Sequence, residues 1–95
     1  MAATKEALVK KKVVEILKEA GAWYCFPVAS GYGRSGIPDI LACKYGEFIA
    51  IECKSGNNTP TALQKRELNL IENAGGTVWV VSEAELPAFK EWCLK

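Results

Sequence analysis

Two carboxylates and an amine flank a predicted hairpin in the middle of the 95-residue chain. Asp39 follows the Gly-Ile-Pro segment 36–38 and begins one apolar stretch, while Glu52 and Lys54 end the next, after a turn at residues 45–46. An unpaired charge on an apolar strand is costly to bury, so charges that converge there need a partner. A divalent cation, which prefers oxygen ligands, is the partner that these residue types indicate.

Strand geometry decides whether these side chains can meet. Side chains alternate between the two faces of a strand, so Glu52 and Lys54 point the same way. If residues 45–46 form a two-residue turn, the antiparallel ladder places Asp39 directly opposite Glu52, with Cβ atoms about 5 Å apart. A longer turn would shift this register. Without a cation the two carboxylates would repel each other, and one would tend to take up a proton.

The chemistry that this trio predicts is hydrolysis of a phosphodiester. Mg²⁺ in such a site keeps several waters and lowers the pKa of a bound water, which makes that water a nucleophile. Lys54 is placed to orient the water or to stabilise charge on the phosphate. The backbone carbonyl of Cys53 is a further candidate ligand, while its thiol faces the core.

Composition excludes several other classes of function. The chain has no His, which rules out histidine-based nucleophilic or general-base catalysis and any zinc site that needs imidazole. The 12 Lys and Arg residues nearly balance the 11 Asp and Glu residues, and a net charge of +1 neither indicates nor excludes a nucleic-acid binder. The four cysteines form no C-x-x-C pair, so we interpret them as reduced residues of a protein in the cytoplasm.

The length favours a single domain over residues 1–95. Neither a signal peptide nor an apolar run of the roughly 18 residues that span a membrane is evident, so we expect no membrane association. Periodicity and turn residues predict an α/β fold, with a mixed central sheet flanked by helices in the order α-β-β-β-α-β-α. The predicted helices cover residues 4–20, 61–74 and 82–94, and the strands cover 23–28, 39–44, 48–54 and 77–81.

The residues of this predicted site resemble the motif of a known group of enzymes. Pro38-Asp39 followed by Glu52-Cys53-Lys54 is similar to the motif of the PD-(D/E)xK nucleases. Within that superfamily the whole chain resembles the virus-type replication-repair nuclease (VRR-NUC) domain. Further support comes from the Thr-Ala-Leu-Gln segment 61–64 and from Gly75-Gly76 before an apolar strand. The family usually has an aliphatic residue where Cys53 stands, a departure that should not affect metal binding.

The resemblance implies a restriction-endonuclease-like core and cleavage of DNA that depends on Mg²⁺ or Mn²⁺. It also implies a stand-alone nuclease that resolves Holliday junctions as a homodimer, since a two-fold dimer supplies two matched sites for paired cuts. A viral origin would place the enzyme in the host-cell cytoplasm. Two alternatives remain open: another PD-(D/E)xK nuclease of flap or restriction type, and a catalytically inert DNA-binding module.

The family also uses a Glu from the first helix, for which Glu6 and Glu15 are candidates. Nine residues at 100° each separate them by about 180°, so they lie on opposite faces. Glu6 shares the inward face of Val13 and Leu17, and we choose it as the possible metal ligand or site-orienting acid. Its structural alternative is a favourable negative charge in the first helical turn.

Four further residues have a functional and a structural interpretation. The family places Gln64 close to the active site, whereas a capping box with Thr61 would direct its amide to the helix start. Arg34 lies in a glycine-containing loop before Asp39 and can pair with phosphate. Ser55 and Lys65 are further candidate contacts to the DNA backbone. Solvated loop or surface positions are the alternative for these last three residues.

Overall fold

The computed structural model describes residues 4–28 and 34–95. Within these ranges the chain forms the predicted mixed α/β fold, and a short 3₁₀ turn (Glu83–Glu85) is the one added element. The elements are α1 (Lys5–Glu19), β1 (Trp23–Cys25), β2 (Ile40–Lys44), β3 (Glu47–Cys53), α2 (Ala62–Asn73), β4 (Thr77–Val81) and α3 (Leu86–Cys93).

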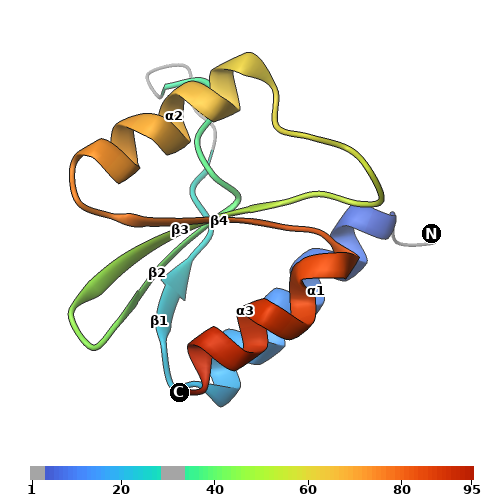
Figure 1. Ribbon diagram of the computed structural model, residues 1–95, viewed down its shortest axis with the longest axis vertical. Helices are drawn as coiled ribbons and strands as arrows, with labels where there is room; N and C mark the ends of the chain where they lie inside the picture. Colours follow the sequence, from blue (N-terminus) through green and yellow to red (C-terminus); the bar gives the residue numbers. More distant parts are fainter. Residues whose placement is uncertain (1–3, 29–33) are drawn as a thin grey trace.

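The four strands form one sheet in the order β1-β2-β3-β4. The first two pairs are antiparallel, and β3 pairs with β4 in parallel through the crossover that contains α2. Helices α1 and α3 lie together on one side of the sheet and α2 lies on the other (Figure 1). β3 is therefore a central strand, covered by helices on both faces.

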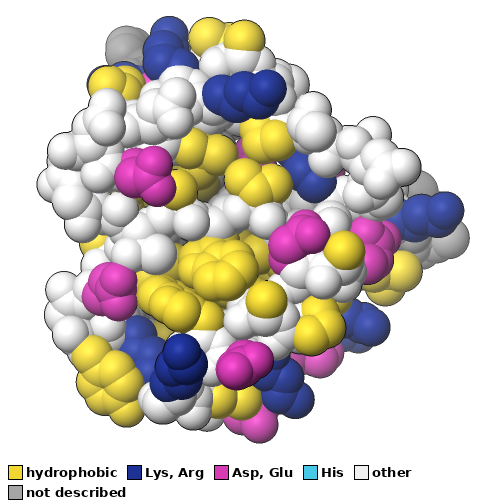
Figure 2. Space-filling model, viewed as in Figure 1, with side chains coloured by type: hydrophobic (Ala, Val, Ile, Leu, Met, Phe, Trp, Pro, Cys, Tyr) yellow, Lys and Arg dark blue, Asp and Glu magenta, His cyan; other side chains and the backbone are white. Residues whose placement is uncertain are grey.

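The hydrophobic core lies between the sheet and the α1–α3 layer. Val13 and Leu17 of α1 and Phe89 of α3 pack there against Ile49 and Ile51 of β3. Because side chains alternate along a strand, Ala50, Glu52 and the following Lys54 face the α2 side. Figure 2 shows hydrophobic side chains gathered in the middle of one face, over β4 and between the two helix layers.

Local sequence signals explain where the elements begin and end. The Thr4 hydroxyl accepts a hydrogen bond from the Ala7 amide, and Thr61 forms a full capping box with Gln64. Tyr45 and Gly46 have φ angles of 53° and 78°, as a tight two-residue hairpin turn requires.

Two predicted boundaries were wrong by three or more residues, whereas the others agree to within one residue. The first strand ends at Cys25 rather than Val28, two residues before Pro27, which has no N–H to donate to a sheet. The last helix begins at Leu86 after the 3₁₀ turn, because Pro87 favours the first turn of a new α-helix. None of the helices in the described ranges has the length and apolar character needed to cross a membrane.

Candidate active site

The ladder between β2 and β3 brings the two predicted carboxylates together. Lys44 pairs with Glu47 and Ile40 pairs with Ile51, so the next pair along the ladder is Asp39 with Glu52. This register is the one predicted from a two-residue turn. Both carboxylates therefore lie on the α2 side of the sheet, at the end of β3 where the chain leaves it.

Glu52 is the most unusual side chain in the described part of the protein. It is 1% exposed, and neither of its carboxylate oxygens has a hydrogen-bond partner among the described residues. Burial and, after it, the neighbouring Asp39 raise its pKa to about 8, whereas the charge of Lys54 acts in the opposite direction. A buried carboxyl group without a partner is a large cost to the fold, which a bound cation would offset.

Asp39 is fixed by the backbone of the neighbouring strand. Its Oδ2 atom accepts a hydrogen bond of 2.8 Å from the amide of Cys53. This bond holds the Asp39 carboxylate against the end of β3, next to Glu52. The Cys53 thiol lies on the opposite face in the core, and burial raises its pKa to about 12, so it is no nucleophile at neutral pH.

Lys54 continues the pairing of β3 with β4, because its amide donates to the Val81 carbonyl at 2.9 Å. Its backbone is thus anchored to the sheet, and its ammonium lies close enough to lower the pKa of Glu52. Ser55 begins a turn in which its carbonyl accepts from the Asn58 amide. Lys65 is exposed on α2.

Glu6 lies in the first turn of α1 and is exposed. Its charge contributes to the raised pKa values of both Glu52 and Cys53, so it lies within electrostatic range of the carboxylate pair. Figure 1 shows the start of α1 and the chain that leaves β3 on the same side of the molecule. Glu15, the other candidate, lies beside α3 in a groove lined by Leu86 and Lys90.

Gln64 forms the capping box with Thr61, which is the structural interpretation of this residue. Its Oε1 atom accepts a hydrogen bond of 2.8 Å from the Thr61 amide, which completes the capping box. The first turn of α2 nevertheless lies against the segment that leads to Asp39, because Gly36 in that segment packs on the backbone of Leu63 and Gln64. A role for Gln64 in contacting phosphate or water remains a proposal.

Arg34 forms an ion pair with Glu67, a residue that the sequence analysis missed. Both contacts between the guanidinium and the carboxylate are 2.8 Å long. A signal was present: Leu63, Leu70 and Ile71 lie four residues before and three and four after Glu67, so this acid interrupts an apolar helical stripe. Such a position predicts a buried charge that needs a partner.

Gly36 allows the Asp39 segment to approach α2 closely. Its φ angle is +82°, and a Cβ atom there would lie 2.5 Å from the Leu63 carbonyl carbon and oxygen and 2.9 Å from the Gln64 nitrogen. These are backbone atoms of a helix and cannot move aside easily. The missing side chain therefore lets the segment that leads to Asp39 pack directly on the start of α2.

We expect Gly36→Ala to lower both stability and activity. The left-handed backbone alone costs a non-glycine residue about 1–2 kcal/mol, and the steric overlap adds to it. Thermal unfolding measures the loss, with Gly56→Ala as the matched control, because Gly56 also has a positive φ but has open space around its Cβ position. Equal destabilisation by the two substitutions would contradict a specific role for close packing at Gly36.

The residues present fit a hard divalent cation. Asp39 and Glu52 supply oxygen ligands, and the Cys53 carbonyl is a further candidate. Among residues 4–28 and 34–95, no group of three His, Cys, Asp or Glu side chains is arranged to hold a metal. Two carboxylates suffice for Mg²⁺, which is commonly bound by one or two carboxylates together with waters and substrate phosphates. The unpartnered Glu52 is the structural observation that favours this fit.

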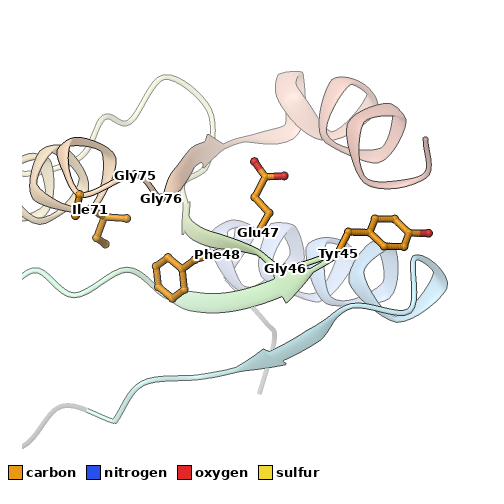
Figure 3. Close-up of a pocket in the computed structure, with 8 residues that line it drawn as sticks. Tyr45, Gly46, Glu47, Phe48, Ile71, Gly75 and Gly76 are labelled. Carbon is orange, nitrogen blue, oxygen red and sulfur yellow. The ribbon is translucent and has the colours of Figure 1, made fainter.

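A separate cavity of about 590 Å³ lies at the other end of β3, between the hairpin turn and the C-terminal end of α2. Figure 3 shows Phe48 directed toward Ile71 and Tyr45 directed away. Its one carboxylate, Glu47, accepts a hydrogen bond from Thr77. This cavity therefore lacks the convergent charges of the Asp39–Glu52 site and has no evident part in the chemistry.

The mixed four-stranded sheet flanked by helices has the restriction-endonuclease-like fold. The family model described as "Archaeal holliday junction resolvase (hjc)" matches residues 1–85, and the chain belongs to this family. The "Putative nuclease p44" of Acyrthosiphon pisum secondary endosymbiont phage 1 is 33% identical over 82 residues, which are 85% of each chain. The chain is therefore a nuclease by family, of a type also found in a phage.

Solved structures agree with this assignment. A structure described as "VRR_NUC domain" superimposes with a TM-score of 0.80 at 33% identity, covering 94% of this chain and 97% of the other. The Holliday junction resolvase Hjc from Archaeoglobus fulgidus superimposes with a TM-score of 0.61 at 20% identity, covering 80% and 66%. The resemblance to a VRR-NUC domain is confirmed, and the second structure shares the fold.

Proposed function

We propose that this chain is a Mg²⁺- or Mn²⁺-dependent endonuclease that cuts branched DNA, with the four-way junction as its substrate. The observation that carries the proposal is the buried Glu52, which has no hydrogen-bond partner among the described residues and faces Asp39 beside Lys54. The family description supports junctions as the substrate class. Within this proposal residues 1–95 act as one nuclease domain.

Each residue of the site has a distinct proposed task. Asp39 and Glu52 bind the cation, with the Cys53 carbonyl as a third oxygen and Glu6 as an acid that completes or orients the site. When bound, the cation activates water for attack and stabilises charge on the phosphate. Lys54 orients the attacking water or stabilises the developing negative charge, and Gln64 assists at the phosphate if its amide leaves the capping box.

Ser55 and Lys65 are proposed to contact the DNA backbone. Backbone contacts fix the orientation of a protein on DNA without reading its sequence, which suits an enzyme that recognises the shape of a junction. We further propose that the chain acts as a homodimer, because a four-way junction needs two matched cuts and a two-fold dimer provides two identical sites.

A panel of labelled DNA structures tests the proposed function. We expect the wild-type protein to nick a four-way junction with Mg²⁺ or Mn²⁺, to cut duplex and flap DNA poorly, and to be inactive in EDTA. Lys54→Ala, assayed beside it, should be inactive, whereas Lys18→Ala, which removes an exposed lysine from α1, should keep full activity. Preferred cleavage of flaps or duplex would favour another PD-(D/E)xK activity.

Calorimetry and light scattering on the same protein test the inert-module alternative and the proposed homodimer. Absence of both cleavage and Mn²⁺ binding in calorimetry would favour an inert DNA-binding module. Light scattering at micromolar concentration should give the mass of a dimer, and a strictly monomeric protein that still makes paired cuts would contradict the homodimer.

A further inference from the structure

The segment that carries Asp39 into the sheet is tied to α2 by a buried carboxylate. Glu67 is 5% exposed, and both of its oxygens are bound by the fork of one guanidinium, with Arg34 Nε and Nη2 each at 2.8 Å. Arg66 adds a longer contact of 3.3 Å from its Nε atom. A bidentate arginine–carboxylate pair fixes geometry as well as charge.

The pair is ionised at neutral pH. Its hydrogen bonds to Arg34 lower the pKa of Glu67, while the same contacts raise the pKa of Arg34. The acid is buried and the arginine is largely exposed, with 6% and 62% of their side-chain surfaces accessible. α2 therefore supplies a fixed anionic anchor, and the segment before Asp39 supplies the side chain that binds it.

Two more contacts follow in sequence. The Ser35 carbonyl accepts from Arg66 Nη2 at 3.5 Å, and Gly36 packs against the backbone of Leu63 and Gln64. Three consecutive residues, 34 to 36, thus touch α2. Pro38, which is buried and has a fixed φ angle, then leads directly to Asp39. Because Gly36 packs on α2 only three residues before Asp39, and Pro38 has a fixed φ angle, the contacts of residues 34–36 restrict where Asp39 can lie.

We propose that Glu67 is a positioning residue of the active site: through Arg34 it holds segment 34–39 against α2 and so keeps the Asp39 carboxylate opposite Glu52 for cation binding. This inference rests on the proposed metal-dependent nuclease function. It gives the Arg34 guanidinium the role of an internal anchor, because its Nε and Nη2 atoms both bind Glu67.

The test measures Mn²⁺ affinity by calorimetry in the absence of DNA. Glu67→Gln keeps the size of the side chain but replaces one acceptor with a donor, which breaks the fork. Arg34→Lys keeps the charge at an exposed position but cannot bind in a bidentate manner. We expect each to weaken Mn²⁺ binding about tenfold, as residues that support metal ligands typically do. Glu72→Gln, which removes an exposed acid from the same helix, should leave Mn²⁺ affinity unchanged.

Two additional readouts separate positioning from DNA contact. The cleavage rate of Glu67→Gln should recover substantially at saturating Mn²⁺, and its affinity for junction DNA in EDTA should equal that of the wild type. Combining Arg34→Lys with Glu67→Gln should weaken Mn²⁺ binding no more than either change alone, because both break one interaction. Circular dichroism and thermal unfolding confirm that the variants compared are folded.

Several outcomes would overturn the inference. The first is a Mn²⁺ affinity of Glu67→Gln equal to that of the wild type, and the second is additive losses of Mn²⁺ affinity in the double variant. The third is a loss of DNA affinity in Arg34→Lys while its Mn²⁺ affinity stays unchanged; this result would make Arg34 a phosphate contact. If the wild type cuts junctions while Glu67→Gln binds Mn²⁺ normally, only the positioning role fails. If the wild type binds Mn²⁺ but cuts no DNA, the nuclease proposal fails, and weakened binding in Glu67→Gln would still support the positioning role.

Discussion

Asp39→Asn is expected to lower the rate of junction cleavage by at least about 100-fold, since losing even a residue that only supports a metal ligand costs 10–100-fold. Asparagine keeps an oxygen that can accept the hydrogen bond from the Cys53 amide, the contact that fixes Asp39 on β3. It removes the negative charge that a cation requires. Single-turnover cleavage of a labelled four-way junction, over a range of Mn²⁺ concentrations, measures the effect.

Comparison with Asp39→Ala separates charge from structure. Alanine loses both the charge and the acceptor, so it should be as inactive as asparagine but less stable in thermal unfolding. A neutral–neutral hydrogen bond of this kind typically contributes about 1 kcal/mol, which sets the size of the stability difference to look for. Near-normal cleavage by a folded Asp39→Asn protein would remove Asp39 from the metal site and leave the nuclease assignment without its first acid.

The sequence allowed the hairpin and its register to be predicted because both depend on local rules. A two-residue turn at Tyr45-Gly46 leaves only one pairing that keeps the alternating apolar residues in the core, and that pairing places Asp39 opposite Glu52. The helix starts at Thr4 and Thr61 are likewise set by capping side chains a few residues away. Interactions of this range can be worked out by counting residues.

The Arg34–Glu67 pair could not be deduced in the same way. The two residues are 33 positions apart and meet only because the crossover places α2 above the segment before β2. Glu67 was recognisable as an acid on an apolar stripe, but nothing local named its partner. Arg34, read alone in a glycine-containing loop, resembled a phosphate contact for the same reason.

The extent of burial at Glu52 was also beyond sequence reasoning. Charges near a strand end are usually solvated, whereas Glu52 lies in a central strand of the folded sheet and is 1% exposed. Gln64 shows the opposite case, in which the functional and capping interpretations were both recognised and the capping bond is formed.

Glu52→Gln is expected to abolish cleavage while making the metal-free protein more stable at high pH. Burial, together with the neighbouring Asp39, raises the Glu52 pKa to about 8, above the ordinary value of 4.5 that applies to the unfolded chain. Between these two values the folded state binds more protons than the unfolded state. The stability that this group contributes is therefore fully present below about pH 4.5 and is lost as the pH rises to about 8.

Thermal unfolding in EDTA from pH 5 to pH 9 measures this effect. The midpoint of the wild type should fall relative to that of Glu52→Gln across the range, because glutamine has no charge to bury. Glu15→Gln, which removes an exposed acid from α1, should follow the wild type. Mn²⁺ should raise the wild-type midpoint at pH 8 by stabilising the charged form of Glu52, and should leave the Glu52→Gln midpoint nearly unchanged. Parallel pH profiles for wild type and Glu52→Gln would show that Glu52 is not held as an uncompensated buried acid, and the argument for a cation between positions 39 and 52 would lose its basis.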